Sequence, residues 1–170
     1  MFLNISKYIG PFHLCGMIIE NIYGFIIRKN TLFDKLYIIS FVLIPFSWAL
    51  CKDECIISYI IKKVENPNYI LGNEPDDVKD ITDLFTNKHQ YMIFYNINNL
   101  LRICSLIIVN NRTTNITYFV LTPTIILYLY YTYDIVYKLN YRKKIYPYFQ
   151  IILCTYLCYI IYTLYISFYI

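Results

Sequence analysis

"IYPYFQIILCTYLCYIIYTLYISFYI", residues 145–170, is a run of 26 residues without one charged side chain. A transmembrane helix needs about 20 consecutive, mostly apolar residues to cross the hydrocarbon core of a bilayer. The run exceeds this length, contains no glycine, and has its only proline, Pro147, near its start, where a helix tolerates one. The stretch therefore predicts one continuous membrane-spanning helix that reaches nearly to residue 170.

The composition indicates the same class of protein. Of the 170 residues, 58% are hydrophobic and 15% are charged, whereas a soluble chain has about 25% charged residues. We therefore expect an all-α integral membrane helical bundle of four or five transmembrane helices, formed by residues 1–170 as a single membrane domain. The expected spans are residues 8–27, 36–55, 91–109, 116–133 and 145–170.

The number of spans depends on the segment 91–109, because three asparagines and Arg102 interrupt its apolar character. If this segment spans, the two chain ends lie on opposite sides of the membrane; if it does not, four spans place both ends on one side. Cytoplasmic loops are enriched in lysine and arginine. In the five-span topology the segments on the side of the N-terminus hold ten of these residues and the opposite loops hold four. This bias predicts a cytoplasmic N-terminus.

The charged triplet Lys52-Asp53-Glu54 interrupts the second span within "SWALCKDECIISY", residues 47–59. We expect one long helix, or two collinear helices, from Leu36 to about Lys63, with the triplet at the membrane boundary and Trp48 in the interfacial aromatic belt. A continuous helix would align Cys51, Cys55, Ser58 and Lys62 along one stripe.

A polar loop, residues 62–90, follows this helix. Asn66-Pro67 is expected to end the preceding helix, because a residue before proline avoids the helical region. Pro75 with Asp76 and Asp77 is typical of a helix start, and helical spacing predicts a short amphipathic helix with an apolar face of Val78, Ile81, Leu84 and Phe85. We expect this loop to contact lipid head groups or a protein partner.

Two charges within candidate spans, Glu20 and Arg102, form the candidate polar site. An unpaired charge in hydrocarbon is costly and tends to be functional. In the five-span topology both spans run in the same direction and the charges lie at similar depth, so we predict that they pair. The pair serves either as a structural link between helices or as part of a transport or gating site. His13 and Asp134 lie toward the inner face and form a weaker proton-relay candidate.

Few other patterns indicate chemistry. The six cysteines lie in or beside apolar runs and are interpreted as packing residues. Asp76, Asp77 and Asp80 match an Asp-Asp-x-x-Asp magnesium motif, but no second acidic cluster accompanies them, so we interpret them as a solvated first helical turn. We expect no catalytic residue, metal or cofactor site, and no nucleic-acid partner, because the basic residues are scattered. Two sequons, at Asn111 and Asn115, give weak glycosylation candidates.

Residues 12–77 contain three short elements: Ser47-Trp48, a Glu-Cys-x-x-Ser-Tyr element at 54–59, and an Asn-Pro-Asn-Tyr-x-Leu-Gly element at 66–72. With these elements the segment resembles small uncharacterised multi-pass membrane proteins encoded by giant DNA viruses. The resemblance implies a viral origin and a membrane setting, and it brings no activity or site residues.

These observations leave three functional hypotheses. The first is a non-enzymatic structural or interaction component of a viral or host membrane. The second is a small transporter or channel that uses Glu20 and Arg102, which a cavity reaching Glu20 would favour. The third is a membrane-embedded lipid or thiol enzyme, which would require Cys51, Cys55, Cys154 and Cys158 to cluster.

Overall fold

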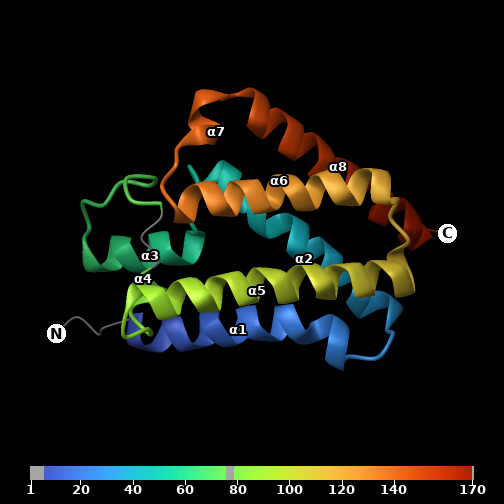
Figure 1. Cartoon of the computed structure of the whole chain (residues 1–170), viewed down its shortest axis with the longest axis horizontal. Coiled ribbons are helices and arrows are strands. Elements are labelled where there is room, and N and C mark those ends of the chain that lie inside the picture. Colours follow the sequence, from blue (N-terminus) through green and yellow to red (C-terminus); the bar gives the residue numbers. More distant parts are fainter. Residues whose placement is uncertain (1–5, 76–78, 170) are drawn as a thin grey trace.

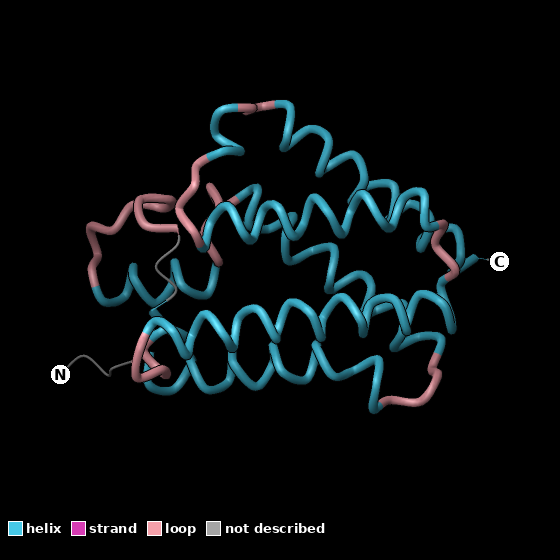
Figure 2. Tube along the Cα trace, viewed as in Figure 1, coloured by secondary structure: helices cyan, strands magenta, loops and turns pink. Residues whose placement is uncertain are grey.

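The computed structural model describes residues 6–75 and 79–169, and within this part of the chain every regular element is a helix (Figure 1, Figure 2). Five of these helices are long and apolar enough to cross a membrane, which confirms the all-α class and the five-helix form of the bundle. They are α1 (Ser6–Ile26), α2 (Thr31–Leu50), α5 (Lys88–Val109), α6 (Tyr118–Val136) and α8 (Tyr148–Tyr169). The short elements are α3 (Ile56–Glu65), α4 (Lys79–Thr82), the π-helical turn η1 (Asn110–Thr114) and α7 (Tyr141–Lys144).

The five long helices alternate in direction (Figure 1). Helices α1, α5 and α8 run from the end of the molecule where α1 begins, called here the N-terminal end, to the opposite end, and α2 and α6 return. The connections α2–α5 and α6–α8, with α3, α4 and α7, therefore lie at the N-terminal end. This arrangement gives α1 and α5 the same direction, as the five-span topology requires.

Short polar residues cap three of the long helices. The side chain of Asn30 accepts a hydrogen bond from the amide of Phe33, and Asn87 does the same for Gln90, while Thr117 caps α6. Such caps satisfy amide groups that have no partner within the helix. Two asparagines and one threonine thus mark the starts of these helices.

Four polar residues of α5 share one buried face, which reduces the polar surface of this asparagine-rich segment. Asn98, Asn99, Arg102 and Ser105 are buried, and their spacing places them on one side of the helix. The opposite side is exposed and carries Ile93, Ile97 and Leu100 together with Asn96. Helix α5 packs along α1, and α2 and α6 pack on α8.

The expectation of helical continuity from Leu36 to Lys63 is wrong. Helix α2 ends at Leu50, and α3 begins at Ile56. Between them Lys52 and Asp53 have positive φ angles of 52° and 72°, which no α-helix accommodates. Helix α3 then continues toward the N-terminal end, displaced sideways from α2 (Figure 1). The stripe through Cys51, Cys55, Ser58 and Lys62 therefore does not exist on a single helix.

The amphipathic loop helix is shorter than expected. Helix α4 comprises only residues 79–82, and residues 76–78, with Asp76 and Asp77, lie outside the described part of the chain. After α4, Leu84 and Phe85 continue as turns, because Phe85 packs its ring against Tyr91 and Phe94 of α5 instead of extending the helix. The predicted helix end at Asn66 is confirmed, since α3 stops at Glu65.

The C-terminal span is continuous from Tyr148 to Tyr169, as predicted, but begins three residues later than 145. Pro147 precedes the helix rather than lying inside it, because the residue before a proline avoids the helical conformation. The other expected spans overlap the remaining long helices, but α2 begins at Thr31, five residues before the expected start, and ends at Leu50.

Gly24 sets the distance between α1 and α5. Its amide donates to Ser105 Oγ at 2.7 Å, and a Cβ on Gly24 would lie 2.6 Å from the backbone oxygen of Ser105. Gly24→Ala is therefore expected to push α1 from α5 and to lower the free energy of unfolding by about 1–3 kcal/mol.

Gly16 provides the matched control on the same helix, because a Cβ there meets no atom within 4 Å. Gly16→Ala should leave stability unchanged or raise it by about 0.5–1 kcal/mol, as expected for glycine replaced within a helix. Thermal unfolding in detergent micelles measures both. Equal behaviour of the two variants would contradict a close α1–α5 approach at Gly24.

Candidate functional site

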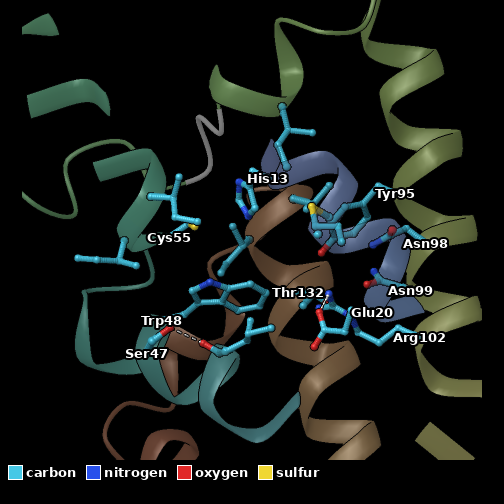
Figure 3. Close-up of a pocket in the computed structure, with 18 of the residues that line it drawn as sticks. His13, Glu20, Ser47, Trp48, Cys55, Tyr95, Asn98, Asn99, Arg102 and Thr132 are labelled. Atoms are coloured by element: carbon cyan, nitrogen blue, oxygen red, sulfur yellow. Dashed lines mark hydrogen bonds and ion pairs between the residues drawn. The ribbon is translucent and has the colours of Figure 1, made fainter. Parts of the chain in front are cut away.

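Glu20 of α1 and Arg102 of α5 form an ion pair inside the bundle, which confirms the predicted pairing (Figure 3). The guanidinium nitrogen Nη2 contacts Glu20 Oε2, and the two side chains are 5% and 14% exposed for Arg102 and Glu20. Their pairing follows from the parallel course of α1 and α5. Because each charge neutralises the other, the two helices can place both in an apolar bundle.

A network of neutral side chains surrounds the pair. Arg102 Nε donates to Asn21 Oδ1 at 3.0 Å, and Arg102 Nη1 donates to the hydroxyl of Tyr128 at 3.2 Å. Tyr128 in turn donates to Asn99 Oδ1 at 3.2 Å. Asn21 Nδ2 bonds to Asn98 Oδ1. The network thus joins α1, α5 and α6 around one guanidinium group.

A cavity of about 540 Å³ reaches this network from the N-terminal half of the bundle. His13, Met17 and Glu20 of α1 line one side, and Ile44, Ser47 and Trp48 of α2 lie across from them. Figure 3 shows His13 and Trp48 directed into the space above Glu20, Asn99 and Arg102. Its volume is within the range of about 300–1,000 Å³ that small-molecule sites occupy. The ion pair at the polar end of this site is predictable from the sequence, whereas the cavity is not.

The cavity is closed beyond Arg102, toward the opposite end of the bundle. One turn further along α5, Ser105 touches Gly24, and the rings of Tyr23 and Tyr37 stack at 4.8 Å. A second ion pair lies past this layer: Arg112 of η1 binds Asp34 of α2 through two nitrogens, at 2.5 and 2.9 Å. Among the described residues, these contacts separate the cavity from the opposite end of the bundle.

Asp134 and His13 lie in different surroundings. His13 lines the cavity. Asp134 instead accepts from Arg142 Nε at 3.0 Å and from the amide of Tyr141 at 2.7 Å. Arg142 also lies 2.5 Å from Asp53 Oδ1, and the hydroxyl of Tyr131 donates to the same oxygen. Asp134 is thus part of a structural link between α6, α7 and the turn after α2, and the proton-relay hypothesis gains no support from these contacts.

Glu54 is the hub of a second buried polar cluster, at the N-terminal end. Its side chain is fully buried and accepts hydrogen bonds from Lys62 Nζ at 2.8 Å, from the hydroxyl of Tyr69 at 2.7 Å and from the amide of Gly72 at 2.8 Å. Lys62 also donates to the carbonyl of Glu74 at 2.6 Å. The hub folds residues 54–74 into a compact loop that begins at the triplet. The position of the triplet at the membrane boundary stays a prediction.

The hub holds a charged lysine. Burial by itself lowers the pKa of Lys62, but the hydrogen bond and the negative charge of Glu54 outweigh it, so that the pKa lies above its ordinary value. Burial and the hydrogen bond to Glu54 raise the pKa of Tyr69. Lys62 is therefore an ammonium and Tyr69 a neutral phenol at neutral pH. Gly72 closes the hub with a φ of 85° and contacts Lys52 so closely that a side chain does not fit.

The loop organised by the hub lies over the cavity. Residues 51–75 and α4, called here the cap, contribute Cys55, Ile56, Ile57, Pro75 and Ile81 to its lining. Glu54, Tyr69 and Gly72 all belong to the short elements at 54–59 and 66–72 that carry the resemblance. The sequence alone does not indicate that these two elements meet in one buried cluster.

The remaining sequence candidates stay apart from the cavity. Asn111 and Asn115 lie exposed in and after η1, at the opposite end; their glycosylation stays a prediction. All six cysteines are free thiols, and no group of three or more metal-ligating side chains occurs among residues 6–75 and 79–169. Thiol or metal chemistry gains no support from this arrangement.

The chain matches no protein-family model, and comparisons with curated proteins and with solved structures gave no significant match.

Proposed function

We propose that this chain is a non-enzymatic multi-pass membrane protein that binds a small molecule inside the bundle, as a binding protein or carrier. The observation that supports this function is the cavity of about 540 Å³ that ends at Glu20 and Arg102. A purely structural ion pair needs no cavity beside it. The packed layer at Gly24 and Ser105 argues for a binding protein or a carrier with one accessible side rather than a channel.

The polar end of the cavity has capacity for a ligand. The guanidinium group of Arg102 has five N–H groups, and three of its hydrogen bonds go to Glu20, Asn21 and Tyr128. Arg102 therefore retains donors, and Asn98 and Asn99 line the cavity beside it. A bound molecule with acceptor atoms can complete these hydrogen bonds without breaking the ion pair.

Native mass spectrometry of the protein purified in mild detergent tests this function. We expect a non-covalently bound mass on the wild-type chain. Gly16→Phe should abolish it, because Gly16 lines the cavity and a Cβ there points into open space. Ile19→Phe is the matched control, since Ile19 is 63% exposed on the same helix and does not line the cavity. Identical spectra of all three proteins would contradict the proposal.

We further propose that the N-terminus is cytoplasmic and that the membrane belongs to a giant DNA virus or its host. The excess of lysine and arginine at the N-terminal end supports the orientation, and the resemblance of residues 12–77 supports the origin. In this orientation the loop 62–90 meets cytoplasmic lipid head groups or a protein partner, and Ile60 and Val64 of α3, both exposed, provide apolar contact area. Protease protection of a tag at residue 1 in sealed vesicles tests the orientation; digestion of the tag from the lumenal side alone would overturn it.

A further inference from the structure

Among residues 6–75 and 79–169, side chains border the cavity at both of its ends along the bundle axis. Toward the opposite end, the contact of Gly24 with Ser105 blocks it. Toward the N-terminal end, the cap borders it with Ile57, Pro75 and Ile81, and the buried Glu54 hub fixes the cap. A molecule from water would have to displace a cluster held by an ion pair that is almost fully buried.

The open side of the cavity lies between α1 and α2. Phe12 lines the cavity although its side chain is 80% exposed, and Gly16 leaves open space at the same wall. Helix α1 packs along α5 and α4, while α2 packs on α8, η1 and α5, so these two neighbours in sequence do not seal the gap. If the five long helices span the bilayer, a gap between α1 and α2 at this level opens toward acyl chains.

The walls and the inner end of the cavity differ in character. The walls are apolar and consist of Phe12, Met17, Ile44, Trp48 and Phe94. Along α1 the cavity extends about 17 Å, from Ile9 to Glu20, at a rise of about 1.5 Å per helical residue. The inner end is polar but carries no net charge, because Glu20 neutralises Arg102. A further full charge at this depth would be unfavourable, whereas hydroxyl and carbonyl oxygens suit the donors that Arg102 retains.

We propose that the cavity binds a neutral single-chain amphiphile, of the chemical class of a monoacylglycerol, that enters from the bilayer between α1 and α2. The oxygens of its head group accept hydrogen bonds from Arg102 and Asn98, and its hydrocarbon chain lies along the apolar walls toward Phe12. This inference rests on the proposed function and names its ligand class and its route.

Trp48, the single tryptophan of the chain, is a built-in reporter for this proposal. It lines the cavity and stacks on Tyr128, whose hydroxyl binds Arg102. A bromine atom quenches indole fluorescence on contact. The full-length protein in nanodiscs is therefore titrated with a monoacylglycerol brominated in its chain. We expect saturable quenching of at least half of the signal, and an apparent affinity weakened at least tenfold by Gly16→Phe and unchanged by Ile19→Phe.

Two further titrations separate the alternatives. A brominated diacyl phosphatidylcholine should quench weakly and without saturation; equal saturable quenching by it would show a wall exposed to bulk lipid and overturn the proposal. A brominated fatty acid should bind more weakly at pH values where it is ionised; tighter binding would overturn the neutral class. Absence of quenching by every probe, together with a bound mass in the native spectra, would reject the amphiphile and leave the proposed binding function standing.

Discussion

Arg102→Met is expected to lower the free energy of unfolding by about 3–5 kcal/mol, which is the usual effect of removing one partner of a buried ion pair. The substitution leaves the carboxylate of Glu20 in the bundle with Ser40 as its remaining hydrogen-bond donor. Asn21 and Tyr128 lose the guanidinium as well. Unfolding in mixed micelles, followed by helical circular dichroism, measures the change.

The double variant Glu20→Gln with Arg102→Met separates charge from packing. If the loss comes from an uncompensated buried carboxylate, removing that charge should restore most of the stability, although Asn21 and Tyr128 still lack their donor. Arg28→Met is the matched control, because Arg28 lies exposed after α1, and it should change stability by less than about 0.5 kcal/mol. A double variant no more stable than Arg102→Met would contradict a neutralising role of Glu20.

This pairing could be predicted from the sequence because the physical argument is local and general. Hydrocarbon excludes unpaired charges, and two spans of the same direction bring residues of equal depth together. The same reasoning located the five long helices, whose length and apolar character require no knowledge of their partners. The polar face of α5 was harder to interpret, because Asn98 and Asn99 weaken the apolar signal that identifies a span.

The turn at Lys52-Asp53 could not be predicted in the same way. Apolar residues on both sides continue the helical pattern, so local preference favours one long helix. The positive φ angles are stabilised by distant contacts instead: Asp53 binds Tyr131 and Arg142, and Glu54 binds the amide of Gly72. Tertiary contacts of this kind override helix propensity.

The cavity has the same origin. No residue pattern within α1 or α2 indicates that the two helices diverge, because their separation depends on the packing of α1 against α5 and of α2 against α8. The sequence could place Glu20 in a span, but whether that carboxylate faces lipid, protein or a cavity is decided by the arrangement of the other helices. The pairing of the two charges therefore follows from local chemistry, whereas the cavity beside them follows from the packing of the other helices.

Glu54→Ala is expected to have the second large effect, again about 3–5 kcal/mol, but confined to the cap. The variant leaves Lys62, which is 4% exposed, charged without its carboxylate, and removes the acceptor of both Tyr69 and the Gly72 amide. Because the five long helices do not depend on this cluster, they should remain folded while residues 54–74 lose their order.

Hydrogen–deuterium exchange resolves this difference. The amides of Gly72 and Glu74, which donate to Glu54 and to Tyr69, should exchange at least a hundredfold faster in Glu54→Ala, since about 2.7 kcal/mol of local stability corresponds to that factor. Amides in the middle of α8 should exchange as in the wild type. Glu65→Ala, at the exposed end of α3, is the matched control and should leave the exchange rate of the Gly72 amide unchanged.

The double variant Glu54→Met with Lys62→Met tests whether charge burial or hydrogen bonding dominates in the hub. Removing both charges relieves the unpaired ammonium, so exchange at Gly72 should fall well below that of Glu54→Ala while staying above the wild type, because the Gly72 amide still lacks an acceptor. If Glu54→Ala exchanged no faster than wild type at Gly72, the cap would be held by its apolar contacts alone. The Glu54–Lys62 ion pair would then not be needed to hold the cap over the cavity.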